Sequence, residues 1–167
     1  MARAKKETAL TPEERLQAAL VPDWEWPYKL PENWCWVKAS AVARIYTGNS
    51  ISEKIKADKY AGQQEGLLFI ATKDIGFDNA IDYETDIRIP DYSNFKIAPA
   101  NTALLCIEGG SAGRKVGFVN REVCFGNKLC AFAAEKVNSK FIYYILQSQY
   151  FIQQFNNCLL YTSDAAD

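Results

Sequence analysis

The segment Thr102–Val119, TALLCIEGGSAGRKVGFV, constrains the fold more than any other part of the chain. Its first residues, TALLCIE, predict a buried strand, and RKVGFV after the glycines is short and bears Val and Phe, which favours a second strand over a helix. Glycines between two strands supply the positive φ angles of a tight turn. The segment therefore predicts a strand, a glycine turn and a second strand.

Two basic residues, Arg114 and Lys115, stand directly beside this turn and suggest that it holds phosphate. A nucleotide-binding loop needs two glycines four residues apart, then Lys, then Ser or Thr, and it leads into a helix. Gly113 follows Gly109 too soon, and Val116 stands where a hydroxyl residue belongs. The pattern therefore disfavours a nucleotide and favours a nucleic-acid backbone, with an ordinary ligand-free turn as the alternative.

Composition supports a folded domain but gives no overall electrostatic sign of nucleic-acid binding. The chain has 167 residues, of which 49% are hydrophobic and 13% aromatic, and its formal net charge is −1. This size suits one domain with a substantial core. DNA binding would therefore have to rest on local charge. Residues 111–129, for example, contain four basic residues and one glutamate.

Five cysteines form no CxxC pair, and the chain has no histidine. A zinc site and a mechanism that needs an imidazole base are therefore disfavoured. Cys106, Cys124 and Cys130 stand in apolar runs and are expected to be reduced core residues. Since no secretory segment or apolar span of about 20 residues is present, we expect a cytoplasmic protein without a membrane partner.

Residues 1–30 are expected to form an N-terminal arm with one short helix. Thr11, Pro12 and Glu14 have the spacing of a capping box with proline at the first helical position, and the helix should end near Leu20. The following segment, VPDWEWPYKLPENWCW, is rich in proline and tryptophan. We expect it to be irregular, with its aromatic side chains packed against the domain.

Several short strands should follow. VARIYTG predicts a strand that closes at Gly48, and GLLFIATKDI predicts one that runs into a polar turn. The polar stretch between them is expected to be a mobile loop, and residues 76–101 a long connection with extended pieces. EVCFGNKLCAFAA predicts a strand pair or a bulged strand around Gly126–Lys128.

A helix capped by Asn138 or Ser139 should follow, with one apolar stripe formed by Phe141, Ile145, Ser148, Ile152 and Phe155. The expected fold class is therefore α+β, a mixed α/β globule of short twisted strands with flanking helices.

The last ten residues, Cys158–Asp167, differ in composition from what precedes them. Written back into one codon choice, CLLYTSDAAD resembles a sequencing adapter translated in frame. We therefore expect residues 158–167 to be a non-native tail and the native sequence to break off near Asn157, with a genuine short tail as the alternative.

Four stretches together resemble the DNA-specificity (S) subunit of type I restriction–modification systems. They are LTPEERLQAALVPDWEWPYKLPENWCWVKASAVARIYTG, GLLFIATKDI, KIAPANTALLCIEGGSAGRKVGFVNREVCFGNKLCAF and FIYYILQSQYF, which span about Leu10 to Phe155. The resemblance rests on their order and spacing.

The resemblance implies that residues 31–157 form a target-recognition domain that binds one half of a split site in double-stranded DNA. Such a subunit is itself non-catalytic and directs methyltransferase (M) and restriction (R) subunits, without a cofactor or a small-molecule substrate. The family carries two recognition domains separated by long helices. This sequence shows one such domain and no long helical spacer, as expected for a truncated subunit.

The expected DNA contacts lie at turns, because lysine and arginine fix register on phosphates while polar side chains match base edges. The candidate phosphate contacts are Lys73, Arg114, Lys115 and Lys128. The candidate base contacts are Thr72, Asp74, Ser111 and Asn127, and Gly110 marks a turn where backbone could approach DNA. Exposed solubilising residues would give the same pattern.

Three other functions stay open at this point. A nuclease is disfavoured because no Glu-x-Lys or Asp-x-Lys follows Pro90-Asp91, and a methyltransferase because no Asn/Asp-Pro-Pro-aromatic loop is present. A protein-interaction scaffold module and an unrelated small DNA-binding protein without enzymatic activity are the remaining alternatives.

Overall fold

The computed structural model describes residues 10–163, with side chains as far as Asn157. The chain divides into two compact units, Met1–Val42 and Ala43–Asp167. Residues 31–42 thus belong to the first unit, although the sequence predicted them as part of the second. The assignment of residues 31–157 as a DNA-binding domain stays a prediction.

The first unit confirms the predicted capping box. Helix α1, Pro12–Ala19, begins after Thr11, whose hydroxyl accepts a hydrogen bond from the Glu14 amide at 3.2 Å. The Glu14 carboxylate accepts one from the Thr11 amide at 2.8 Å. These two bonds satisfy amide groups that the first helical turn leaves free. The helix ends at Leu20, as predicted.

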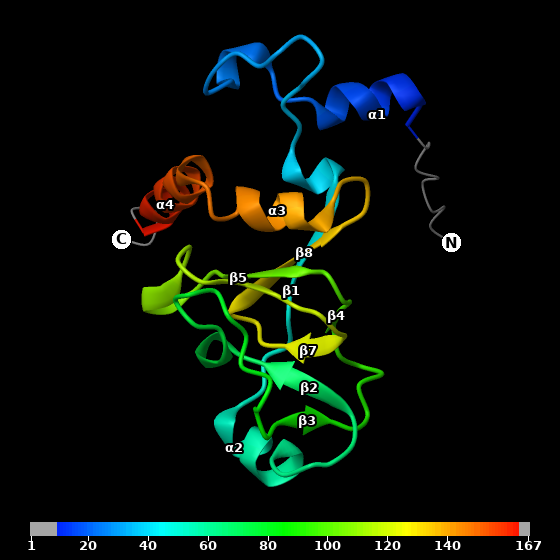
Figure 1. The fold of residues 1–167 in the computed structure, drawn as a ribbon, viewed down its shortest axis with the longest axis vertical. Helices are drawn as coiled ribbons and strands as arrows, with labels where there is room; N and C mark the ends of the chain where they lie inside the picture. Colours follow the sequence, from blue (N-terminus) through cyan, green and yellow to red (C-terminus); the bar gives the residue numbers. More distant parts are fainter. Residues whose placement is uncertain (1–9, 164–167) are drawn as a thin grey trace, which may run out of the picture. The chain divides into compact units, whose positions relative to one another are not determined.

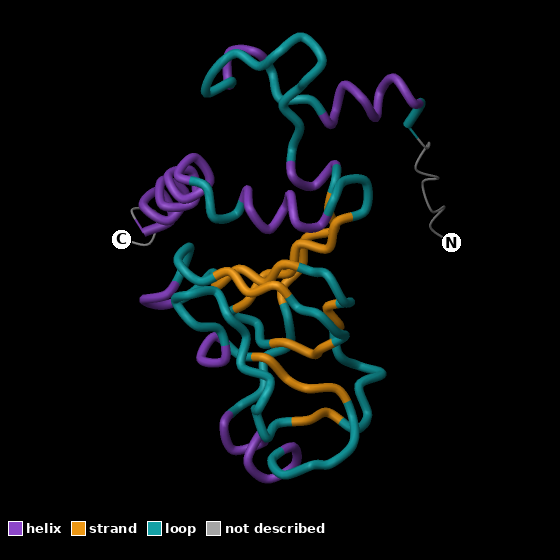
Figure 2. Tube along the Cα trace, viewed as in Figure 1, coloured by secondary structure: helices purple, strands orange, loops and turns teal. Residues whose placement is uncertain are grey.

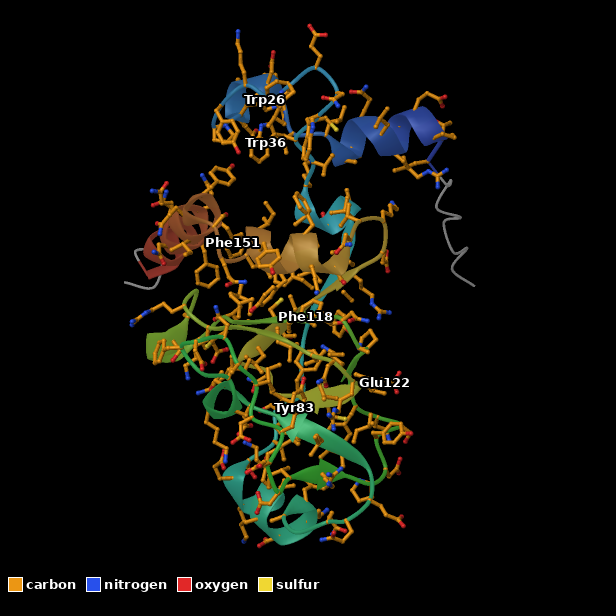
Figure 3. The ribbon with its side chains drawn as sticks, viewed as in Figure 1. Trp26, Trp36, Tyr83, Phe118, Glu122 and Phe151 are labelled. Carbon is orange, nitrogen blue, oxygen red and sulfur yellow. The ribbon has the colours of Figure 1, made fainter. Side chains whose placement is uncertain are left out.

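The tryptophan-rich segment that follows is irregular apart from one short 3₁₀ turn, η1 (Asp23–Glu25), and a second such turn, η2 (Ala39–Ala41), comes after it. The indoles of Trp26 and Trp36 donate to backbone carbonyls of this segment (Figure 3). Trp24, however, is 81% exposed, and Trp34 is exposed as well. The expectation that all these aromatics are packed is wrong, because a unit of this size has too little interior for four indoles.

The second unit contains two four-stranded sheets (Figures 1 and 2). The first is antiparallel and has the order β1 (Ala43–Thr47), β8 (Leu129–Ala134), β5 (Ala103–Cys106) and β6 (Val116–Phe118). The second has the order β3 (Arg88–Ile89), β2 (Leu67–Ile70), β7 (Val123–Phe125) and β4 (Ile97–Ala98). Strands β2 and β7 are parallel, and the other pairs of this sheet are antiparallel. With its helices, the unit confirms the predicted α+β class.

The predicted strand, glycine turn and strand are confirmed. Strands β5 and β6 pair antiparallel, and the 3₁₀ turn η5, Gly109–Ser111, lies between them. Gly109 and Gly113 have φ angles of 75° and 70°, which disfavour any residue with a Cβ atom.

Strands β7 and β8 are consecutive in the chain but belong to different sheets, so the expected strand pair or bulged strand is wrong. Strand β7 pairs with β2 and β4, whereas β8 pairs with β1 and β5. All three residues of β7 are buried, which suits a central strand covered on both faces. The link Gly126–Lys128 therefore connects the two sheets.

One core cluster unites both sheets. It includes buried residues of β2, β5, β7 and β8, among them Leu68, Leu104, Phe125 and Leu129. Cys106, Cys124 and Cys130 are buried and free of disulfides, as expected. This shared core fixes the turns that follow β2 and β7 relative to each other.

The polar stretch after Gly48 is helical rather than a loop. Helix α2, Glu53–Ile55, begins after Ser52, whose hydroxyl accepts from the Ile55 amide, and it continues into one π-helical turn, η3 (Lys56–Tyr60). Ile51 and Tyr60 anchor this segment on the cluster around Phe69. Ile51 and Tyr60 are too few apolar residues to show a helical period in the sequence, so the helix was not predicted.

The C-terminal region forms two helices, α3 (Ser139–Ile145) and α4 (Gln149–Ser163). Asn138 caps α3, as predicted, but the expected apolar stripe is wrong. Phe141 and Ile145 are exposed, whereas Ile142 and Leu146 are buried. Ser148 accepts from the Phe151 amide at 3.2 Å and thus caps α4 instead of belonging to a stripe.

Residues 164–167 and the side chains of residues 158–163 lie outside the described part of the chain. The interpretation of Cys158–Asp167 as a non-native tail stays a prediction.

Candidate nucleic-acid interface

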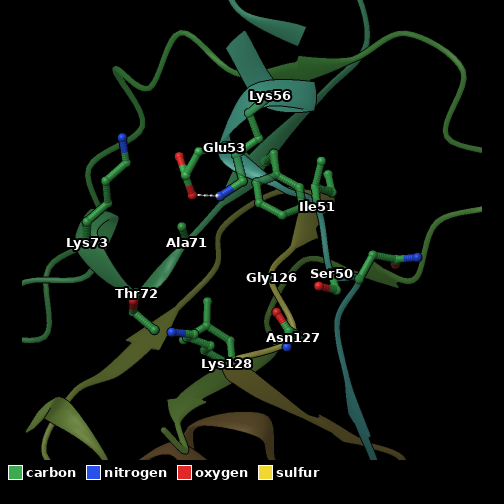
Figure 4. Close-up of a pocket in the computed structure, with 13 residues that line it drawn as sticks. Ser50, Ile51, Glu53, Lys56, Ala71, Thr72, Lys73, Gly126, Asn127 and Lys128 are labelled. Atoms are coloured by element: carbon green, nitrogen blue, oxygen red, sulfur yellow. Dashed lines mark hydrogen bonds and ion pairs between the residues drawn. The ribbon is translucent and has the colours of Figure 1, made fainter. Parts of the chain in front are cut away.

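A cleft of about 470 Å³ opens where the ends of β2 and β7 meet the segment after β1 (Figure 4). We call it the basic cleft, because it contains three lysines and one glutamate among its charged residues. Its lining comprises Asn49, Ser50, Ile51, Glu53, Lys56, Phe69, Ala71, Thr72, Lys73, Gly126, Asn127, Lys128 and Leu129.

The first wall of the basic cleft is the 3₁₀ turn η4, Thr72–Asp74, which follows β2 directly. The Asp74 carboxylate accepts a hydrogen bond from the Ala71 amide at 2.8 Å and closes this turn. Asp74 is only 8% exposed, and this burial raises its pKa above the ordinary value. Thr72 and Lys73 are thus displayed by a turn that Asp74 stabilises.

The second wall is the link between β7 and β8. The Gly126 amide donates to the Ile70 carbonyl at 2.9 Å, and the Asn127 amide donates to the Asn49 carbonyl at 3.2 Å. The link is therefore fixed to the end of β2 and to the residue after Gly48. It carries the half-buried Asn127 and the exposed Lys128 into the cleft.

Lys56 forms the third wall, and it is not among the site residues predicted from the sequence. Its ammonium group is 2.7 Å from a Glu53 carboxylate oxygen and 5.5 Å from the centre of the Phe69 ring. The hydrogen bond from Lys56 lowers the pKa of Glu53. In the sequence, Ser52 directly before Glu53 is the residue type that caps a helix. It was the one indication of a helix that would place Lys56 in the cleft.

The glycine turn carries a second basic group beside the cleft. The Lys115 ammonium donates to the Thr72 carbonyl at 3.3 Å, so the turn is connected to the first wall. Arg114 and Lys115 both lie close to the Phe77 ring, at 5.0 and 4.7 Å from its centre.

Glycines of this turn have different structural roles. A Cβ atom at Gly113 would lie 2.7 Å from the Phe155 ring, so Gly113 allows α4 to pack closely. A Cβ atom at Gly110 would meet nothing within 4 Å. Gly110 is exposed and has no steric requirement of its own, which leaves its backbone open to a ligand.

The structure thus groups most of the predicted residues. Thr72, Lys73, Asn127 and Lys128 line the basic cleft, and Arg114 and Lys115 lie beside it. Gly110 and Ser111 lie on η5 and do not line the cleft. Asp74 lies beneath the surface with its carboxylate engaged.

The basic cleft has the chemistry of a nucleic-acid contact. Lysine side chains bind phosphate oxygens, and amide and hydroxyl groups donate to and accept from base edges. Among residues 10–163, no group of three or more His, Cys, Asp or Glu is placed to hold a metal ion. No helix in that part of the chain is long and apolar enough to span a membrane.

Solved structures provide the decisive comparison. The HsdS subunit from Thermoanaerobacter tengcongensis superposes with a TM-score of 0.61 and 21% sequence identity, over 84% of this chain and 32% of that chain. The chain has the fold of one part of an HsdS subunit. This confirms the resemblance that the sequence suggested.

A second structure gives the same result. It was described for complex assembly and conformational transition of the type I R-M system, and it matches with a TM-score of 0.58 and 22% identity, over 74% of this chain and 29% of that chain. The chain therefore spans about a third of the length of these neighbours. No protein-family model matches the sequence, and the search of curated proteins finds no match.

Proposed function

We propose that the chain is a sequence-specific DNA-recognition domain of a type I restriction–modification specificity subunit. In this role it is non-catalytic, acts in the cytoplasm, and directs methyltransferase and restriction subunits to one half of a split DNA site. The observation that carries the proposal is the basic cleft, where three lysines surround Thr72 and Asn127 on an HsdS-like fold.

The roles divide by side-chain chemistry. Lys73 and Lys128 neutralise phosphates at the cleft, while Lys56 is paired with Glu53, and Arg114 contacts the DNA backbone beside the cleft. Thr72 and Asn127 face base edges, which they match through a hydroxyl and an amide. Asp74 keeps the Thr72 turn closed and makes no contact with DNA itself.

Salt dependence provides a quantitative test. A protein that neutralises one phosphate changes the slope of log K against log salt by about 0.9, so Lys73→Ala with Lys128→Ala should reduce the slope by about 1.8. The matched control is Lys59→Ala with Lys140→Ala, which removes two exposed lysines that do not line the cleft.

The assay is a selection from randomised duplex DNA by the full chain, alone and with the methyltransferase subunit of its own host. Fluorescence anisotropy of the selected duplexes, measured across a salt series, follows. We expect a recovered consensus, a reduced slope for the cleft variant and an unchanged slope for the control. Equal binding to all sequences, or equal slopes for both variants, would refute the proposal.

One observation favours a second role in protein contact. Helix α3 exposes Phe141, Tyr144 and Ile145, which form an apolar surface unusual for a solvent-facing helix. A scaffold role would use this face to bind another subunit. Phe141→Ser with Ile145→Ser should then abolish co-purification with the methyltransferase subunit and leave DNA binding by the chain unchanged.

A further inference from the structure

A small hairpin beside the basic cleft is closed by backbone hydrogen bonds. Residues Ile75 and Ile81 form an antiparallel bridge, and the Gly76 amide donates to the Ala80 carbonyl at 2.8 Å. The Asn79 amide returns a hydrogen bond to the Gly76 carbonyl at 3.1 Å. We call residues 75–81 the Phe77 hairpin, because Phe77 stands at its tip.

The hairpin is also anchored to two other elements. Asn79 adopts a φ of 65°, and its side-chain amide donates to the Gln147 side-chain oxygen at 2.9 Å. Its side-chain oxygen accepts from the Val116 amide, the first residue of β6, at 3.0 Å. A non-glycine residue in the left-handed region costs free energy, so these contacts must hold it there. The tip therefore has one fixed direction.

Phe77 is the large apolar side chain exposed at this tip. It is 62% exposed, and Asp78 beside it is exposed as well, whereas Ile75 is buried and Gly76 half-buried. Arg114 and Lys115 lie close to the ring on the adjoining turn. An apolar ring with two cations close to it has the composition of side chains that insert between stacked bases while the cations bind phosphates.

The ring is not needed to position both cations. The Lys115 ammonium group is already held by the Thr72 carbonyl at 3.3 Å. Most of the ring surface is still open to solvent with both cations in place. A ring whose only task was to hold Arg114 would not need a hairpin fixed by four backbone and side-chain bonds.

We propose that Phe77 is a wedge that enters a groove of duplex DNA and partly unstacks one base step. Arg114 and Lys115 bind the phosphates that flank this step. The proposal rests on the proposed DNA-recognition function and adds to it a local deformation of the duplex. Sequence preference then arises in part from how easily a given base step opens.

The test uses the full chain and duplexes selected by it, with the fluorescent base 2-aminopurine placed at each position in turn. Unstacking increases the fluorescence of this base. We expect an increase at one step with the wild-type chain, and its loss with Phe77→Ala. Affinity for that variant should fall by about tenfold, with the salt slope unchanged, because no phosphate contact is removed.

Two further variants make the result specific. Phe77→Trp should retain the fluorescence increase, since it keeps a large apolar ring. Tyr92→Ala removes another exposed aromatic ring, which does not line the basic cleft, and should behave as the wild type. Thermal unfolding of each variant checks that the exposed substitutions leave the fold intact.

Three outcomes would overturn the wedge. The wild-type chain could bind selectively without any fluorescence increase, or Phe77→Ala could bind and unstack as the wild type does. If Phe77→Ala had a smaller salt slope than the wild type but the same 2-aminopurine fluorescence, the ring would only position the two cations. Each of these leaves the proposed function in place, whereas failure of the wild-type chain to select any duplex would refute both.

Discussion

Gly48 is the position where a single methyl group should do most damage to the site. A Cβ atom there would lie 2.0 Å from the Phe125 carbonyl oxygen and 2.6 Å from the Gly126 carbonyl oxygen. Both obstacles are backbone atoms of β7 and of the link that carries Asn127, so neither can move aside as a side chain could. Gly48→Ala must separate the end of β1 from this link.

The size of the effect follows from the contacts that would be lost. Overpacking a rigid site costs about 1–3 kcal/mol. The separation also strains two hydrogen bonds, from the Gly48 amide to the Leu129 carbonyl and from the Asn49 amide to the Phe125 carbonyl. With a net contribution of about 1 kcal/mol for each bond, we expect Gly48→Ala to reduce the free energy of unfolding by about 3–5 kcal/mol.

Urea denaturation followed by circular dichroism measures this difference, and Gly110→Ala is the matched control. The control makes the same chemical change at a site where the new methyl group meets nothing within 4 Å. Its stability should stay within about 0.5 kcal/mol of the wild type. If Gly48→Ala were as stable as Gly110→Ala, the close approach of β1 to the β7–β8 link would be wrong.

Two further predictions concern buried ionisable groups. Because burial raises the pKa of Asp74 in the folded state, the folded chain binds this proton more tightly than the unfolded chain, and stability should fall as pH rises from about 3.8 through the raised pKa. Asp74→Asn keeps the acceptor for the Ala71 amide, so it should remove this pH dependence and be at least as stable as the wild type at pH 7. Asp74→Ala should lose about 1 kcal/mol of stability. Urea titrations at several pH values measure both variants, and equal behaviour of Asn and Ala would contradict the prediction. Burial also raises the pKa of Cys124 to about 11, while Cys35 is exposed. Iodoacetamide at pH 8 should therefore modify Cys35 and spare Cys124 until denaturant is added, and rapid labelling of native Cys124 in peptide mass spectra would show that the core is open.

Local signals in the sequence were sufficient wherever neighbours in the chain decide the structure. Thr11 and Glu14 fix the start of α1 through bonds between residues three apart, and the glycines after β5 fix a turn between adjacent strands. Ser148 shows the limit of such signals. Its spacing fits an apolar stripe, but its hydroxyl caps the helix α4 instead. Helix α3 also buries a different face from the expected one, with Ile142 and Leu146 buried in place of Phe141 and Ile145.

The site needed information from distant parts of the chain. Thr72 and Asn127 were chosen as separate turn residues, and only the parallel pairing of β2 with β7 brings their turns to one cleft. Lys56 was missed because its helical segment has few apolar residues and takes its shape from packing on Phe69. Tertiary contacts of this kind leave no periodic pattern in the sequence.

The antiparallel pairing of β1 with β8 has a consequence for synthesis of the protein in the cell. Ala43 pairs with Ala134, which is added 91 residues later. At about 5–20 residues per second, β1 is synthesised roughly 5–18 s before β8, the strand with which it pairs in the described part of the chain. During this interval the nascent chain carries an unpaired strand edge that a second nascent chain could bind. Chaperone contact at β1 would therefore coincide with translation of the basic cleft, which is complete only when Leu129 has been added.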